Sequence, residues 1–260
     1  MTRRRSKKKQ KSPLSGVVWL AAVILLVLWV INSPGFSFLL PGNQYFAPED
    51  FARRGGQITY LAGEAEQGID VSYYQGEIDW QAVRESGISF AFVRVGYRSS
   101  EDGTIHEDEM ARKNLTGAAA AGVKVGAYFF SQAVNDREAA EEAEFTLALL
   151  KEFQTELPVV YDWEPYNGDR TDGMTRDDLT RCVYAFCDTV ELAGYDSMVY
   201  FNRDLSRTLL DVTRLSRYEV WFAMYEDYPR PPCKIDYWQY TDEGTVPGIT
   251  GKVDKNLYFP

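Results

Sequence analysis

Leu157-Pro-Val-Val-Tyr-Asp-Trp-Glu-Pro165 is a short apolar run that leads directly into two acids, Asp162 and Glu164. It predicts a buried strand on which both acids share one face, because side chains at i and i+2 of a strand point the same way. Two carboxylates held so close repel each other and are partly desolvated, which raises the pKa of one toward a value useful for proton donation. This is the acid pair of a glycosidase in outline. A strand end with two solvated acids fits the segment equally well.

Apolar runs and amphipathic segments alternate on both sides of that stretch. Strands are predicted at 68–71, 90–95, 123–130, 157–161 and 198–201, and helices at 78–86, 108–121, 136–153 and 175–193. This alternation predicts a parallel sheet with right-handed crossovers. Further strands are expected at 219–223, 236–241 and 252–256, with few helices between them. Eight strands and about five helices predict an α/β fold, an irregular TIM-like β/α barrel.

Four acids are expected at one rim of this barrel. Active sites of such barrels lie at the carboxyl ends of the strands, and Asp70, Asp162, Glu164 and Asp254 each fall near such an end. Two alternatives stay open: Asp70 as a turn cap and Asp254 as a solvated strand-end acid.

Several segments together closely resemble the lysozyme family called glycoside hydrolase family 25, the Chalaropsis-type N-acetylmuramidases. They are Gly68-Ile-Asp-Val-Ser-Tyr-Tyr-Gln-Gly-Glu-Ile-Asp-Trp80, Tyr161-Asp-Trp-Glu-Pro165, Asp236-Tyr-Trp-Gln-Tyr-Thr241 and Val246-Pro-Gly-Ile-Thr-Gly-Lys-Val-Asp-Lys-Asn256. Segments between them agree in order: Phe90-Ala-Phe-Val-Arg-Val-Gly96, Val125-Gly-Ala-Tyr-Phe-Phe-Ser-Gln132, Val199-Tyr-Phe-Asn202 and Trp221-Phe-Ala-Met-Tyr225. The resemblance runs from about Gly68 to Asn256, and it implies the same barrel fold.

The resemblance also implies an activity and a role for each acid. It implies cleavage of the β-1,4 bond between N-acetylmuramic acid and N-acetylglucosamine in peptidoglycan. Glu164 would be the general acid, and Asp162 would keep its proton affinity high and orient the acetamido group of the substrate. Asp254 would be the second carboxylate, with Asp70 completing the cluster. In related enzymes the N-acetyl group is thought to act as internal nucleophile; retaining and inverting routes stay open, because a sequence gives no carboxyl separation.

Aromatic and amide side chains near the predicted strand ends suit a sugar-binding cleft. Sugars present apolar C–H faces that stack on rings, while their hydroxyl groups need polar partners. The expected substrate-binding residues are Tyr128, Tyr200, Asn202, Trp221, Trp238 and Gln239. For each aromatic residue, a place in the core is the alternative.

The first part of the chain differs in charge from the rest. Seven of the 28 basic residues and no acid lie in residues 1–48, so 21 basic residues face 38 acids beyond it, a formal charge of −17. An uncharged run at 15–31 follows the basic block at 1–14 and is long enough for a transmembrane anchor. The positive-inside rule predicts a single-pass bacterial membrane protein with its N-terminus cytoplasmic and its catalytic domain outside. A cleaved signal peptide and a secreted protein are the alternative. Residues 32–66 read as a linker and 67–260 as the barrel.

Other kinds of site find no support in the sequence. His106 is the only histidine, and its surroundings lack the ligand spacing of a metal site. No phosphate loop or dinucleotide motif occurs, so no cofactor and no metal are expected. The negative charge of residues 49–260 disfavours nucleic-acid binding.

Three other functions remain open. A chitinase-like glycosidase would also use a strand-end acid pair, but that pattern places an acid where this chain has Val160. A non-catalytic wall-binding or scaffold protein on the same barrel is disfavoured by the presence of all four acids. A membrane-tethered enzyme that opens the wall for assembly of a larger machine has the same sequence features as one that remodels the wall.

Overall fold

The computed structural model describes residues 44–165 and 170–260. The basic tail at 1–14, the anchor predicted at 15–31 and the first part of the linker lie outside these residues. None of the helices in the described ranges combines the length and apolar character that crossing a membrane requires.

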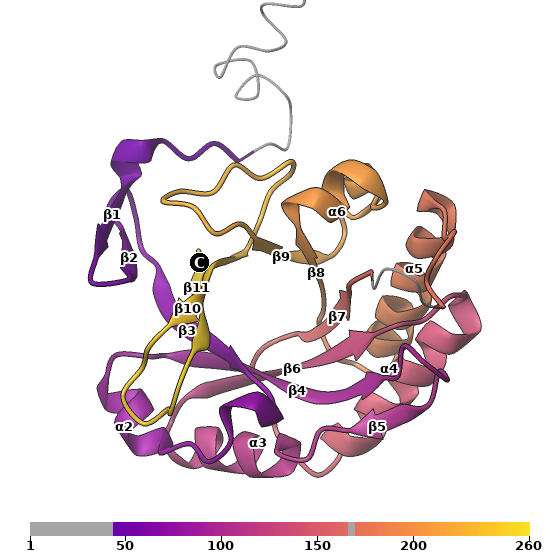
Figure 1. Cartoon of the computed structure of the whole chain (residues 1–260), viewed down its shortest axis with the longest axis horizontal. Helices are drawn as coiled ribbons and strands as arrows, with labels where there is room; N and C mark the ends of the chain where they lie inside the picture. Colours follow the sequence, from indigo (N-terminus) through magenta and orange to yellow (C-terminus); the bar gives the residue numbers. More distant parts are fainter. Residues whose placement is uncertain (1–43, 166–169) are drawn as a thin grey trace, which may run out of the picture. The chain divides into compact units, whose positions relative to one another are not determined.

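A closed ring of eight strands forms the centre of the folded unit (Figure 1). In ring order the strands are β3 (Glu66–Val71), β4 (Phe90–Arg98), β6 (Lys124–Ser131), β7 (Val159–Trp163), β8 (Ser197–Asn202), β9 (Glu219–Ala223), β10 (Tyr237–Gly244) and β11 (Val253–Tyr258). Neighbours from β3 to β10 pair in parallel, whereas β11 runs antiparallel to both β10 and β3. The predicted α/β barrel is confirmed, with one reversed strand that the sequence did not indicate.

Helices cover the outside of the parallel part of the ring (Figure 1). They are α2 (Trp80–Glu85), α3 (Ala111–Ala120), α4 (Asp136–Leu150), α5 (Arg176–Leu192) and α6 (Arg203–Thr208). Shorter elements complete the described chain: η2 (Pro48–Asp50), η3 (Tyr73–Gln75), η4 (Val212–Arg214) and β5 (Ile105–Glu107), which pairs with β4. The helix starts follow local chemistry, since the side chains of Asp79, Asn135, Thr175 and Asn202 each accept a hydrogen bond from a backbone N–H of the first turn.

A hairpin of β1 (Phe51–Arg54) and β2 (Gln57–Tyr60) covers the part of the ring that has no helix. The rings of Phe51 and Trp238 of β10 pack in a T-shaped arrangement with centroids 5.4 Å apart, and Ile58 is fully buried. Without this cover, the outward apolar side chains of β10 and β11 would be exposed to water, at a cost of about 25 cal/mol per Å². The hairpin lies inside the predicted linker at 32–66, so from Phe46 onward that segment is folded onto the barrel.

Aromatic and aliphatic side chains fill the inside of the ring below the carboxyl rim. Phe92 stacks on Trp221 with centroids 4.8 Å apart, and Val160 and Met198 are fully buried beside them. Gly68 leaves the room that the Phe90 ring occupies, because a Cβ there would lie 2.2 Å from that ring. The barrel is therefore packed at its centre, as barrels of this size are.

Candidate active site

Asp162 and Glu164 face the inside of the barrel because of strand alternation. The intervening Trp163 points outward, where its Nε1 donates a hydrogen bond to the carbonyl oxygen of Ala133 at 3.0 Å. The side-chain Nε2 of the buried Gln132 donates to the carbonyl oxygen of Glu164 at 2.6 Å, which fixes the strand end. Both acids line the same cavity, so the predicted shared face is confirmed.

All four predicted acids line one cavity of about 200 Å³ at the carboxyl ends of the parallel strands. Asp70 reaches it from the end of β3 and Asp254 from the start of β11. These two residues are direct partners in the β3–β11 pairing. Asp254 arrives at this rim because β11 is antiparallel and begins where the parallel strands end.

A network of amides and phenols holds the carboxylate of Asp70. Its Oδ1 accepts hydrogen bonds from Gln239 Nε2 at 3.0 Å and from Asn256 Nδ2 at 2.8 Å. The hydroxyl groups of Tyr200 and Tyr225 both donate to Gln239 Oε1, at 3.1 and 2.9 Å. With its oxygen occupied in this way, the Gln239 amide can only present its nitrogen to Asp70.

Asp254 holds the proton that it shares with Asp70. Burial, followed by the charge of Asp70, raises the pKa of Asp254 to about 9. Burial also raises the pKa of Asp70, but the two amide donors favour its ionised form. At neutral pH the carboxyl group of Asp254 is therefore protonated and donates to Asp70.

The pKa values of the inner acid pair are raised as well. Burial, and after it the charge of Glu164, holds the pKa of Asp162 well above its usual range. Burial and the charge of Asp70 raise the pKa of Glu164. Asp162 Oδ1 is buried and has no hydrogen-bond partner among the described residues. The site therefore combines a carboxyl group of raised pKa at Glu164 with an unsatisfied polar atom two residues before it.

We expect Asp254→Asn to stabilise the protein, and more so as the pH rises. In the unfolded chain this carboxyl group loses its proton near pH ~3.9, whereas in the fold it keeps the proton to about pH 9. Ionisation therefore favours the unfolded state throughout this range, and the stability of the parent falls as the pH rises through it. Asparagine removes this cost and can still donate to Asp70, a gain of about 1–3 kcal/mol in the free energy of unfolding at pH 7.

Urea unfolding of the parent and the variant at pH 5 and pH 8 measures this effect. Glu109→Gln, which changes an exposed acid, serves as the control. A gain that is larger at pH 5 than at pH 8 would contradict the assignment of the proton to Asp254.

Four of the six predicted substrate-binding residues line the acidic cavity: Tyr128, Tyr200, Trp221 and Gln239. Asn202 lines the adjoining pocket instead, where its side chain also caps α6. Trp238 does not reach either cavity, because it is fully buried on the outer face of β10. Its neighbour Gln239 points inward, and successive side chains of a strand point to opposite faces. The expectation that Trp238 contacts sugar is therefore corrected.

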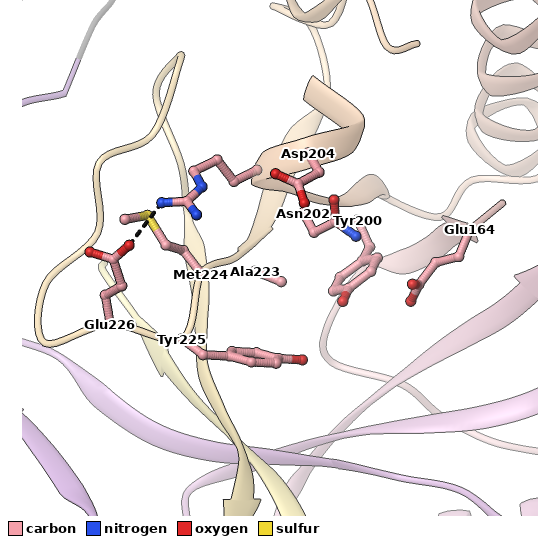
Figure 2. A pocket seen from close by; sticks show the side chains of 9 residues that line it. Glu164, Tyr200, Asn202, Asp204, Ala223, Met224, Tyr225 and Glu226 are labelled. Atoms are coloured by element: carbon pink, nitrogen blue, oxygen red, sulfur yellow. Dashed lines mark hydrogen bonds and ion pairs between the residues drawn. The ribbon is translucent and has the colours of Figure 1, made fainter. Parts of the chain in front are cut away.

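A second pocket, of about 430 Å³, adjoins the acidic cavity (Figure 2). The two share Glu164, Tyr200 and Tyr225. Figure 2 shows Asn202 and Asp204 on one side of this pocket and Tyr225 on the other. Tyr225 is 49% exposed, and its ring can stack on a ligand. Glu164 thus lies where two binding spaces meet.

Two kinds of site residue were missing from the sequence prediction. Arg94 lines the acidic cavity and is buried, with Nε donating to Asp108 Oδ2 at 2.8 Å. Its guanidinium lies 5.1 and 5.4 Å from the ring centroids of Tyr73 and Tyr74. The sequence signal that could have identified Arg94 was a charged residue inside an otherwise apolar strand, two positions after Phe92. Asn256, which joins Trp221 to Asp70, gave no comparable signal.

The model of the family described as glycosyl hydrolases family 25 matches residues 69–249. An autolytic lysozyme of Clostridium acetobutylicum is 27% identical over 190 residues, which cover 72% of this chain and 54% of the relative. Lysozyme M1 of Streptomyces globisporus is also 27% identical, with 74% of this chain and 67% of the relative covered. The chain thus spans only about half the length of the first of these relatives.

A solved structure shares the fold over most of the chain. The modular autolysin LytC of Streptococcus pneumoniae, solved in complex with a synthetic peptidoglycan ligand, is 26% identical with a TM-score of 0.69. The likeness covers 80% of this chain and 52% of that one. The match of the family model includes Asp70 at the end of β3, and β7, after which Glu164 follows. The chain belongs to glycosyl hydrolase family 25.

Proposed function

We propose that this protein is a peptidoglycan hydrolase, a muramidase that cleaves the β-1,4 bond between N-acetylmuramic acid and N-acetylglucosamine. The observation that carries the proposal is the place of Glu164, between an acidic cavity and an adjoining pocket. A glycosidic oxygen beside Glu164 would have one sugar in each. The named relatives are lysozymes, and LytC was solved with a peptidoglycan ligand, which supports the substrate class.

In the proposed reaction Glu164 acts as the general acid. Its raised pKa favours the protonated form, so it can donate a proton to the glycosidic oxygen as the bond to C1 breaks. The carbonyl oxygen of the substrate's own N-acetyl group attacks C1 to give a cyclic intermediate. Water then opens this intermediate and returns a proton to Glu164.

Asp162 would position that N-acetyl group. Asp162 lines the cavity and its buried Oδ1 has no protein partner in the described ranges, so this carboxyl group suits an amide N–H of the substrate. The carboxylate of Asp70, which the amides of Gln239 and Asn256 hold, would supply negative charge opposite the positive character developing at C1. Asp254 would thus donate a hydrogen bond to Asp70 instead of acting as a second anion.

The proposed location of the enzyme at the cell membrane rests on the sequence of its first 31 residues. The basic block before an uncharged run is typical of a membrane anchor with its N-terminus inside. Such an anchor would hold the barrel next to the wall. Labelling the chain with a thiol or amine reagent that cannot cross membranes, in intact cells and after lysis, distinguishes a barrel outside the membrane from a barrel inside the cell.

The sugar at the newly formed reducing end decides the specificity. The purified protein is incubated with peptidoglycan or with chitin, and the products are reduced and identified by mass spectrometry. Reduced muramic acid is expected, from peptidoglycan only. Reduced glucosamine or cleavage of chitin would support the chitinase-like alternative, and binding without any release of reducing ends would support a scaffold. NMR of the first product gives the anomer, and release of the inverted sugar would exclude the acetamido route.

A further inference from the structure

The hairpin β1–β2 lies before the part of the chain that the family model matches, yet it is built into the barrel. Its carbonyl oxygen at Ile58 accepts a hydrogen bond from Gln67 Nε2 at 2.6 Å. The backbone N–H of Leu61 donates to the carbonyl oxygen of Asp50 at 2.6 Å. With Ile58 and Phe51 buried against β10, the hairpin is a fixed support.

Arg53 reaches from this hairpin to the segment that follows β9. Its Nε donates to Asp227 Oδ1 at 2.7 Å, and its Nη2 donates to the carbonyl oxygen of Glu226 at 2.9 Å. Two donors of one rigid guanidinium thus bind two successive residues. Such a contact fixes geometry in a way that a flexible point charge does not.

Trp238 makes a second connection from the hairpin to the same segment. The Phe51 ring packs on its indole in a T-shaped arrangement, and the indole Nε1 donates to the carbonyl oxygen of Met224 at 2.9 Å. The N–H of Met224 in turn donates to the carbonyl oxygen of Gln239 at 3.0 Å. Residues 224–227 are therefore held at both ends by contacts that lead back to the hairpin or to β10.

This segment forms one wall of the pocket beside Glu164. Met224, Tyr225 and Glu226 line the pocket, and the carboxylate of Glu226 pairs with Arg203 of α6 at 2.8 Å and with Arg230. Figure 2 shows Glu226 at the far side of the pocket from Glu164. Two groups of Glu226 therefore fix the position of the wall. Its carboxylate pairs with Arg203 and Arg230, and its carbonyl oxygen accepts a hydrogen bond from Arg53.

We propose that the hairpin β1–β2 is a structural part of the glycan cleft, and that Arg53 positions residues 224–227 as the wall for the sugar next to the acidic cavity. The inference rests on the proposed function and adds an element from outside the family match. Arg53 does not contact the sugar in this arrangement and is a positioning residue. Its ion pair is largely in water, with side-chain exposures of 33% and 80%, so it adds little to the stability of the fold.

Arg53→Ala is therefore expected to change glycan binding more than folding. We expect the KM for peptidoglycan fragments to rise about threefold to tenfold, with kcat within about twofold of the parent. Arg54→Ala is the matched control, because Arg54 is the exposed neighbour in the same strand. Both variants should keep the melting temperature of the parent, which separates positioning from general destabilisation.

Hydrogen exchange gives a readout that does not depend on activity. In Arg53→Ala the backbone amides of 224–230 should exchange faster than in the parent, while those of β4 and β6 keep their protection. Asp227→Ala, which removes the ion pair and leaves the bond to Glu226, should give a smaller change in both exchange and KM. It also serves as the test variant if Arg53→Ala does not fold.

The outcomes separate this inference from the proposed function. A parent protein that releases no reducing ends from peptidoglycan overturns the proposed function. An active parent with the same KM and the same exchange in Arg53→Ala and Arg54→Ala overturns only the role of the hairpin. A fall in kcat with unchanged KM would also overturn it, because the wall would then act on the chemical step.

Discussion

Glu164→Gln is expected to lower kcat on peptidoglycan about 10²- to 10⁴-fold, the usual contribution of a general acid. Glutamine keeps the size of the side chain and the backbone hydrogen bond from Gln132, but it has no proton to give to the leaving oxygen. KM and the melting temperature should change little. Removal of a partly buried acid with a raised pKa stabilises the fold slightly.

The pH dependence of the parent tests the same assignment. Burial and the charge of Asp70 raise the pKa of Glu164, and the reaction needs its protonated form. The rate should therefore fall as the pH rises through that pKa, which lies above the ~4.3 of a free glutamic acid. Glu109 is an exposed acid, and the Glu109→Gln variant should keep the pH–rate profile of the parent. A Glu164→Gln variant that digests cell walls as fast as the parent would exclude Glu164 as the acid and favour a scaffold.

Asp162→Asn is expected to lower kcat about 10²- to 10³-fold, the effect of removing one group that acts in the transition state. The carboxyl group of Asp162 faces the cavity with one oxygen free of protein partners in the described residues. An asparagine of the same shape turns one of its two polar ends into a donor, which cannot accept from the N–H of the acetamido group. The orientation of the internal nucleophile is then lost.

A glycan without its N-acetyl groups supplies the control for Asp162. The parent should cleave N-deacetylated peptidoglycan far more slowly than the acetylated form. Asp162→Asn should add little to that loss, because both changes remove the same interaction. Independent, additive losses would show that Asp162 acts on something other than the acetamido group.

The acid pair could be predicted because its geometry is local. Strand alternation alone places Asp162 and Glu164 on one face, and the apolar residues before them show that the strand is buried. The alternating strands and helices likewise predicted a barrel with its site at the carboxyl ends. The direct pairing of Asp70 with Asp254 depends on β3 and β11 being neighbours, which the closure of the ring shows.

Other features depend on which strands pair and in which direction. Trp238 and Gln239 were both expected in the cleft, although alternation allows only one of two adjacent residues to face inward. In the closed ring Gln239 faces inward and contacts Asp70, whereas Trp238 faces outward and is covered by the hairpin. The hairpin itself has too little apolar periodicity to be recognised alone, and its Phe51 packs on Trp238 and Phe259, which lie far along the chain.

The sequence by itself determined the strand and helix order, the acid pair and the rim where the chemistry lies, because backbone alternation and burial are properties of short segments. The tertiary structure decided the reversed direction of β11, the protonated state of Asp254 and the contact of Arg53 with the wall beside Glu164. These properties arise between residues that are far apart in the chain. Their distances and desolvation exist only once the ring has closed.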